Sequence, residues 1–205
     1  VVALYNSAHT VDRLIAELSA LQIAGGHEII LVDDGSADGT PDRVERHLDG
    51  KHPPITLLRL ARNFGEHNAV LAGLRHARGT HVITLDDDFQ NPPEEALKLW
   101  HRARSGGFDL VYGALPQKRH AWWRNLGSRF TNGVAVILLQ KPRGLYLSSF
   151  RCMSAFVAAE AARYSGPFVY LDGHLLQITG SIDQIEVLHA PRLSGKSGYT
   201  LRKLT

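Results

Sequence analysis

The hydrophobic positions of this chain alternate between short continuous runs and longer stretches with helical spacing. Runs rich in Val, Ile and Leu, typical of buried strands, occupy residues 1–5, 28–33, 55–60, 81–85 and 109–112. Between them, the stretches that favour helices are residues 11–21, 40–48, 68–76 and 93–104. This alternation predicts an α/β fold, with a mostly parallel sheet covered by helices on both faces.

Local signals support the starts of two helices. Thr10 is expected to cap the first helix and Thr40 the second, where Pro41 takes the first helical position. In the helix after the paired prolines at 92–93, the residues expected to face the core are Leu97, Trp100 and Ala103. Both the caps and this apolar face predict helices that pack on the sheet.

The alternation weakens after Gly113. Residues 117–129 carry four cations and no acid, and predict a basic loop that runs into a helix. An edge strand is expected at 150–153, a helix at 154–164 and a last strand at 184–189. Without a repeat or a linker, the chain predicts a single domain over residues 1–191, followed by a basic segment at 192–205.

Composition narrows the class of protein. The 205 residues, 44% hydrophobic and 21% charged, are ordinary globular usage and exclude disordered and fibrous classes. The single cysteine, Cys152, excludes a disulfide framework and a cysteine-rich zinc site, and is expected to be buried. The longest apolar run, residues 134–139, is far below the roughly 20 residues of a membrane span. No signal-peptide pattern is visible, and a net charge of +3 is too mild to indicate nucleic acid.

Polar side chains gather where three predicted strands end, at residues 5–7, 33–40 and 86–90. In an open parallel sheet, ligands bind beyond the carboxyl ends of the strands. Asp86 and Asp88 can offer oxygens to one hard divalent cation, and such a cation can hold a diphosphate. Each cluster alone is ordinary turn chemistry, but two acidic clusters after hydrophobic strands favour a functional site.

Other sites are excluded by their missing signatures. Residues 194–197 look like the end of a phosphate-binding loop, but Ala190 stands where that motif needs glycine. The sequence has no Gly-x-Gly-x-x-Gly after the first strand, no His-Glu-x-x-His and no Gly-x-Ser-x-Gly. A dinucleotide fold, a zinc protease and a serine hydrolase are therefore not expected.

Three segments, Val32–Thr40, Arg62–Gly65 and Asp86–Glu94, resemble glycosyltransferase family 2. The branch most similar is that of the polyprenyl-phosphate glycosyltransferases, which includes dolichyl-phosphate mannose synthase and undecaprenyl-phosphate sugar transferases. The similarity extends from about Val1 to Leu204. It implies a Rossmann-like GT-A fold, a nucleotide-sugar donor, inversion at the anomeric carbon and a Mg²⁺ or Mn²⁺ ion.

The resemblance also implies roles for residues on the donor side. Tyr5 and the pair Asp33–Asp34 match the part that holds the base and ribose of the nucleotide sugar. Asp86 and Asp88 match the metal-binding Asp-x-Asp, with Asp88 among the catalytic residues, and Gln90 matches a glutamine of the metal–diphosphate site. Asp87 stands where many members have alanine, and its role is open.

For the acceptor side, the resemblance implies a phosphate site. Arg124 and Ser128, both also expected to be catalytic, match a pair that meets the acceptor phosphate, and Arg119 and Lys196 are expected beside it. No catalytic base can be transferred from the family at Ser149. A phosphate monoester is already largely a dianion at neutral pH and needs little base, whereas a hydroxyl acceptor needs one.

The resulting prediction is a metal-dependent inverting enzyme that moves a sugar to a polyprenyl phosphate at the cytoplasmic face of a membrane. Two basic segments are expected to contact the membrane surface: residues 117–129, which contain Trp122 and Trp123, and residues 192–205. One alternative is a hydroxyl acceptor with Asp172 as base, although Asp172 also fits a helix N-cap. A second alternative is a non-catalytic nucleotide-sugar-binding domain. Nucleic acid is not an expected partner, and the oligomeric state stays open, a homo-oligomer included.

Overall fold

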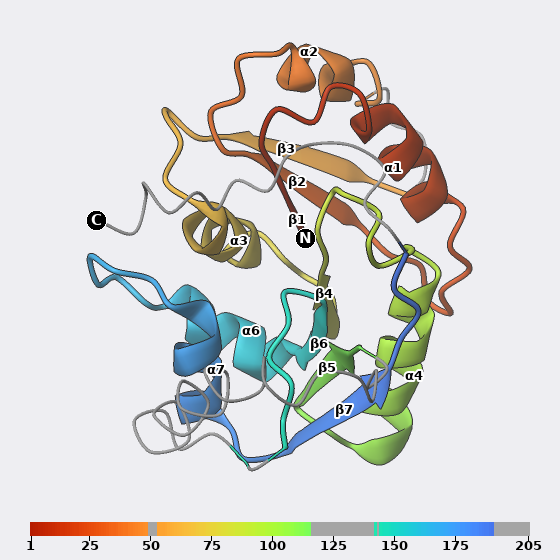
Figure 1. Ribbon diagram of the computed structural model, residues 1–205, viewed down its shortest axis with the longest axis vertical. Coiled ribbons are helices and arrows are strands. Elements are labelled where there is room, and N and C mark those ends of the chain that lie inside the picture. Colours follow the sequence, from red (N-terminus) through yellow and green to blue (C-terminus); the bar gives the residue numbers. More distant parts are fainter. Residues whose placement is uncertain (49–52, 116–141, 143, 191–205) are drawn as a thin grey trace, which may run out of the picture.

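The computed structural model describes residues 1–48, 53–115, 142 and 144–190 (Figure 1). Strands and helices alternate along the first part of the chain: β1 Val2–Leu4, α1 Val11–Ser19, β2 Ile29–Asp33, α2 Thr40–Glu45, β3 Ile55–Arg59, α3 Glu66–Leu74, β4 His81–Thr84, α4 Glu95–Gly106 and β5 Leu110–Ala114. The later elements are β6 Arg151–Ser154, α6 Ala155–Ala162, α7 Leu171–Ile178 and β7 Ile182–Glu186. The predicted α/β alternation is confirmed.

The strands form two hydrogen-bonded groups, in the orders β1-β2-β3 and β4-β6-β5-β7. A parallel bridge between Val2 and Leu85 joins them at β1 and the end of β4. β6 pairs antiparallel with β4 and β5, while the other pairings, β1 with β2, β2 with β3 and β5 with β7, are parallel. Every described strand except β6 therefore runs in one direction, so that their carboxyl ends share one edge.

The prediction of an edge strand at residues 150–153 is wrong in its position. β6 lies between β4 and β5, inside the sheet. Its residues Arg151, Cys152 and Met153 are at most 1% exposed, since helices cover both of its faces. The antiparallel insertion explains why the chain loses its regular alternation after β5.

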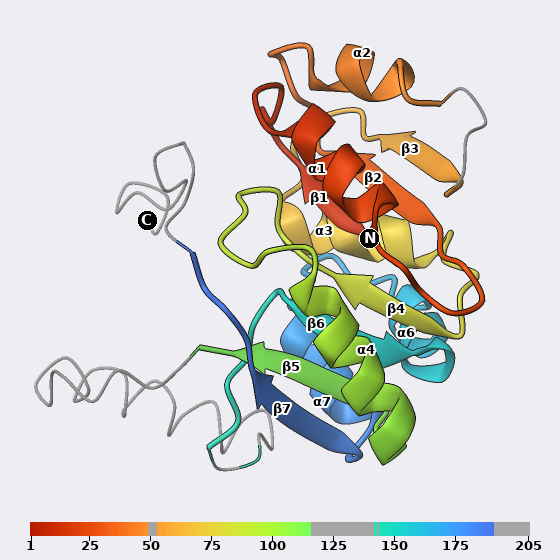
Figure 2. The same cartoon turned by 90° about the vertical axis from the view of Figure 1, so that its right-hand side faces the viewer.

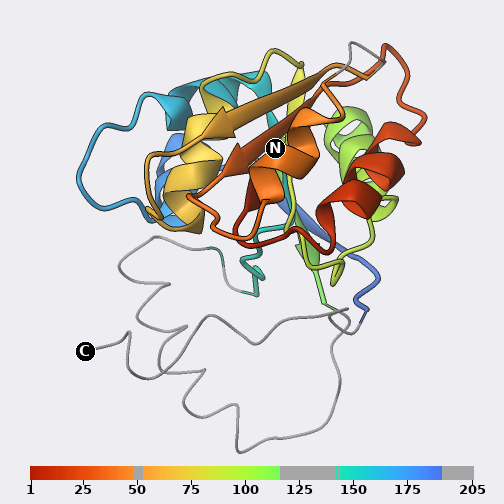
Figure 3. The same cartoon turned by 90° about the horizontal axis from the view of Figure 1, so that it is seen from above.

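Helices cover both faces of the sheet, as predicted (Figure 3). Successive residues of β2 point to opposite sides, because side chains alternate along a strand. Leu31 packs in a cluster with residues of α1 and α4, and Ile30 and Val32 pack against Ala69 of α3. A further cluster joins α3, α6 and α7 over the other strands. Both faces are buried, as is usual for parallel sheets.

Two details of the helix predictions need correction. The N-cap of α2 is Gly39, in the left-handed region with φ 84°, and Thr40 is already helical because its hydroxyl serves other partners. Thr10 stands at the N-cap position of α1, but its hydroxyl donates to the carbonyl of Ser7 and caps no N–H group. In α4 the buried apolar residues are Ala96, Leu99 and Ala103, whereas Leu97 and Trp100 are only half-buried.

Among the helices of the described residues, none is long and apolar enough to cross a bilayer. The domain boundary at residue 191 stays a prediction, because the basic segment that follows lies outside the described part of the chain.

Candidate functional site

The polar strand ends of the sequence meet at one edge of the sheet. β1, β2 and β4 run parallel, so the turns that follow them lie side by side beyond their carboxyl ends. β6 starts at the same edge, because it runs antiparallel to β4. This is the edge at which open α/β sheets bind ligands.

The turns after β1 and β2 are tied to each other by four hydrogen bonds. These bonds are Asn6 N to Ser36 Oγ (2.9 Å), Ser7 N to Thr40 Oγ1 (2.8 Å), Ala8 N to an Asp38 carboxylate oxygen (2.9 Å) and Ala37 N to Asn6 Oδ1 (3.0 Å). Asn6 takes the left-handed conformation, with φ 54°, that lets its side chain turn back. The two turns form one cradle, and the half-exposed Tyr5 stands at its rim.

Asp33 and Asp34 are both buried, but they serve different parts of the cradle. The Asp33 carboxylate accepts a long hydrogen bond from the Ser36 N–H, at 3.3 Å. The Asp34 carboxylate accepts from the Phe64 N–H at 2.7 Å and from the Gly65 N–H at 2.9 Å. Asp34 therefore fixes the loop before α3 against the end of β2.

Gly35 allows this close approach of the two loops. A Cβ atom at Gly35 would lie 2.7 Å from the backbone carbonyl carbon of Arg62, and its φ of 73° already disfavours other residues. The Asp-Asp-Gly sequence thus fixes the segment at 62–65, which is the second segment of the family resemblance.

The loop after β4 presents the predicted metal ligands, and Ser149 supports one of them. Ser149 Oγ donates to Asp86 Oδ2 at 2.6 Å, and Thr84 Oγ1 donates to the Ser149 carbonyl at 2.5 Å. Asp88 Oδ1 accepts from the Gln90 N–H at 3.0 Å. The start of β6 thereby helps to hold the acidic loop, a contact that the sequence analysis did not anticipate.

Phe89 anchors the turn between the acidic residues and Gln90. It is 5% exposed, takes a φ of 59°, and lies under the Arg13 guanidinium, 4.6 Å from the ring centroid. Because the Phe89 ring is buried, the neighbouring side chains of Asp88 and Gln90 lie on the polar side of the turn.

Asp87, whose role was open, connects this loop to the cradle. Its carboxylate accepts a hydrogen bond from Ser7 Oγ, and the Ser7 N–H donates to Thr40. Burial raises the pKa of Asp87, and the charges of Asp86 and Asp88 act in the same direction. Hydrogen bonds through Ser7 thus connect the acidic loop to the start of α2.

The donor set of the acidic loop fits a hard divalent cation. The described residues contain no group of three His, Cys, Asp or Glu arranged to hold a metal. Asp86, Asp88 and the amide oxygen of Gln90 are oxygen donors of the kind that Mg²⁺ and Mn²⁺ accept. A cation held by so few side chains takes its remaining ligands from a diphosphate and water.

The segment after β7 reaches the acidic loop (Figure 2). The Ala190 N–H donates to the Gln90 carbonyl at 2.8 Å. The side-chain amide of Gln90 also contacts the His189 ring, with 3.4 Å between the two Nε2 atoms. In the sequence, the basic segment at residues 192–205 begins two residues after Ala190. Sequence reasoning missed His189, which has no local motif.

Asp172 is buried in an ion pair. Its Oδ1 pairs with the Arg151 guanidinium and accepts a hydrogen bond from Tyr112 Oη at 3.0 Å. The N-cap of α7 is Tyr170, so the N-cap interpretation of Asp172 is wrong. Burial, with the nearby Asp172 charge, raises the pKa of Tyr112 far above its ordinary range.

Glu66 and His67, in the first turn of α3, lie near the ion pair of Arg151 and Asp172. Burial raises the pKa of Glu66 to about 7, and the charge of Asp86 contributes in the same direction. Burial lowers the pKa of His67. Sequence reasoning did not select either residue, because each is a lone polar residue at a helix start.

The predicted acceptor site falls outside the described part of the chain. The acceptor residues Arg119, Arg124, Ser128 and Lys196, together with Trp122 and Trp123, lie outside the described residues. Cys152 is buried as predicted, and burial raises its pKa to about 12, which makes it an unreactive thiol.

Comparison with known proteins decides the family. The family model described as Glycosyl transferase family 2 matches residues 1–157, more than half of the chain. The chain belongs to glycosyltransferase family 2. This membership and the GT-A-like fold, both inferred from the sequence, are confirmed.

Curated relatives narrow the branch. Over 212 residues the chain is 32% identical to the undecaprenyl-phosphate 4-deoxy-4-formamido-L-arabinose transferases of Pseudomonas aeruginosa (strain LESB58) and Edwardsiella ictaluri (strain 93-146). All of this chain is aligned in both cases, against 60% and 63% of the relatives. The chain thus spans about three fifths of the length of these relatives.

Solved structures of glycosyltransferases share the fold. Glucosyl-3-phosphoglycerate synthase of M. tuberculosis superposes with a TM-score of 0.71 at 19% identity, covering 99% of this chain and 73% of that one. The mannosyltransferase PcManGT of Pyrobaculum calidifontis, in complex with GDP-Man and Mn²⁺, gives 0.67 at 20% identity, covering 97% and 57%. The described strands and helices therefore form a GT-A-like domain.

Proposed function

We propose that this family 2 domain transfers a sugar, with inversion, from a nucleotide-diphosphate sugar to a polyprenyl phosphate at the cytoplasmic face of a membrane. The observation that carries the proposal is the hydrogen bond from Ser7, in the turn after β1, to Asp87 in the acidic loop after β4. Ser7 belongs to the cradle that Asp33 borders, so this bond joins the cradle to the acidic loop. A nucleoside and its diphosphate need such adjacent sites.

The donor side is supported by geometry and by a neighbour. Tyr5 and Asp33 border the cradle that would take the base and ribose, and Asp34 acts through the loop that it holds. Asp86, Asp88 and Gln90 would hold Mg²⁺ or Mn²⁺, and PcManGT is a structure with a nucleotide sugar and Mn²⁺. When bound, the cation neutralises charge on the departing diphosphate.

The acceptor is proposed from the names of the relatives and from the chemistry. The relatives carry undecaprenyl phosphate in their names. Asp172, the base required by the hydroxyl alternative, is engaged by Arg151 and Tyr112. A phosphate dianion attacks without a base, so the phosphate acceptor fits this site better. Both Asp86 and Asp88 are present, which disfavours the non-catalytic alternative.

On the acceptor side, Arg119, Arg124, Ser128 and Lys196 are proposed to neutralise the phosphate. Arginine suits this role because its planar fork binds phosphate oxygens in pairs. Residues 192–205 carry four cations and no acid, and an anionic leaflet attracts each by about 1 kcal/mol. Together with residues 117–129, they are proposed to give weak, salt-sensitive membrane binding.

The experiment is a donor panel with the full-length protein. Labelled nucleotide sugars are incubated with undecaprenyl phosphate and Mn²⁺ or Mg²⁺, and the organic phase is counted. We expect one donor to label the lipid, with loss of the product when EDTA is added. No labelled lipid with any donor, or full labelling in EDTA, would contradict the proposal.

A further inference from the structure

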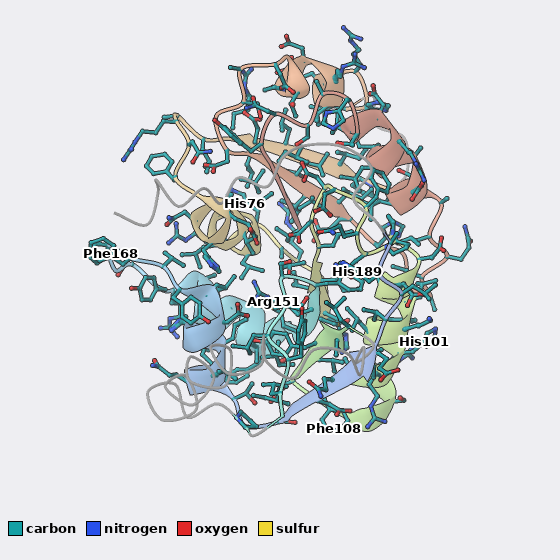
Figure 4. All side chains as sticks on the ribbon, viewed as in Figure 1. His76, His101, Phe108, Arg151, Phe168 and His189 are labelled. Atoms are coloured by element: carbon teal, nitrogen blue, oxygen red, sulfur yellow. The ribbon has the colours of Figure 1, made fainter. Side chains whose placement is uncertain are left out.

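A polar cluster borders the acidic loop where α3, β6 and α7 begin. It comprises Glu66 and His67 at the start of α3, Arg151 at the start of β6, and Tyr170 and Asp172 at the start of α7. The rings of His67 and Tyr170 meet edge to face, with centroids 5.8 Å apart, so the two helix starts are in contact. Figure 4 shows Arg151 near the centre of the molecule, between these helices and the strands.

The cluster faces the acidic loop. Arg151 lies opposite Thr84 in the pairing of β6 with β4, two residues before Asp86. Ser149, two residues before Arg151, donates a hydrogen bond to Asp86, and Arg151 Nη1 donates to the Ser148 carbonyl at 3.3 Å. Glu66 is also fixed relative to the cradle, since the N–H of the preceding residue, Gly65, donates to Asp34.

Two buried nitrogen atoms in this cluster lack a hydrogen-bond partner among the described residues. They are Arg151 Nε, on a side chain that is 1% exposed, and His67 Nδ1. Buried polar atoms are nearly always paired in native proteins, and an unpaired one costs about 1–3 kcal/mol. Two such atoms in one polar cluster indicate a polar space in which a water molecule or a polar ligand group completes the hydrogen bonding.

The charges of the cluster favour a neutral ligand. The Arg151 guanidinium is paired with Asp172, and Glu66 adds a further carboxyl. This balance does not attract a phosphate. A hydroxyl-rich ring suits it, because hydroxyl groups both donate and accept hydrogen bonds.

We propose that Glu66, His67 and Arg151 recognise the sugar that is transferred, by hydrogen bonds to its ring substituents, and that Glu66 determines which sugar is accepted. The inference rests on the proposed function. A sugar attached to a diphosphate at Asp86 and Asp88 lies next to this cluster, because the segment 148–149 contacts both Asp86 and Arg151.

The test compares donors with and without the sugar. Calorimetry in Mn²⁺ measures the bare nucleoside diphosphate and the nucleotide sugar on the full-length protein and on Glu66→Ala and His67→Phe. The phenyl ring keeps the contact with Tyr170 but removes Nδ1. We expect unchanged diphosphate affinity and about a tenfold loss of nucleotide-sugar affinity, with partial recovery in Glu66→Gln. Glu160→Gln, at an exposed ion pair on α6, is the matched control.

A second readout is the ranking of donors that differ at one ring position. Glu66→Ala is expected to change their ratio of kcat/KM by about tenfold. Equal losses for diphosphate and nucleotide sugar would overturn the inference, since Glu66 would then serve the cation. An unchanged ranking in an active enzyme would overturn the inference alone, whereas a wild type that uses no donor overturns the proposed function as well.

Discussion

Removal of the Asp172 carboxylate is expected to destabilise the domain rather than only stop chemistry. The Arg151 side chain is 1% exposed and that of Asp172 is 11% exposed, so Asp172→Ala leaves a buried charge without its partner. Tyr112 Oη loses its acceptor at the same time. Breaking a buried pair from one side costs about 3–5 kcal/mol.

For a domain of this size, each kcal/mol lowers Tm by about 2–4 °C, so the expected fall is roughly 6–20 °C. Thermal unfolding followed by circular dichroism measures it. The matched control is Asp183→Ala, which breaks the more exposed pair with Arg102 and should cost about 0–1 kcal/mol. The double variant Arg151→Met with Asp172→Leu removes both charges and should recover most of the stability.

The opposite result would support the hydroxyl alternative. If Asp172→Ala keeps the Tm and the nucleotide-sugar affinity of the wild type but loses all transfer, Asp172 is a catalytic base and not a structural partner of Arg151. The reasoning from burial would then be refuted, and with it the preference for a phosphate acceptor.

Three further substitutions test the donor side. Asp88→Asn should abolish transfer at unchanged Tm, because an amide lacks the charge that a divalent cation needs; near-normal activity at saturating Mn²⁺ would exclude Asp88 as a ligand. Asp33→Ala should weaken binding of the bare nucleoside diphosphate about tenfold by calorimetry, and an unchanged affinity would make it a turn residue only. Ser7→Ala removes the hydrogen bond to Asp87. It should raise the Mn²⁺ concentration for half-maximal activity about fivefold, which corresponds to the net free energy of one hydrogen bond. Ser165→Ala, at an exposed serine, is the control. If both variants need the same Mn²⁺ concentration for half-maximal activity, the bond between Ser7 and Asp87 does not position the acidic loop.

The strands and the two acidic clusters could be predicted because their signals are local. Continuous β-branched runs identify buried strands, and Asp-Asp-Gly or Asp-x-Asp at a strand end identifies a polar turn. The insertion of β6 between β4 and β5 could not be predicted, because the pairing of strands that are distant in the sequence leaves no local pattern. One signal was available: Arg151 stands among apolar residues of a buried strand, so it needs a buried partner. Asp172 supplies it, from a helix start that sequence spacing does not connect to β6.

A phosphate acceptor is tested most directly by comparing two acceptors that differ only in the phosphate. The full-length protein, its preferred nucleotide sugar and Mn²⁺ are incubated with undecaprenyl phosphate or with undecaprenol, and the glycolipid is identified by mass spectrometry. We expect a sugar on the phosphate and no product from the alcohol. Transfer to the alcohol at a comparable rate would contradict a phosphate acceptor.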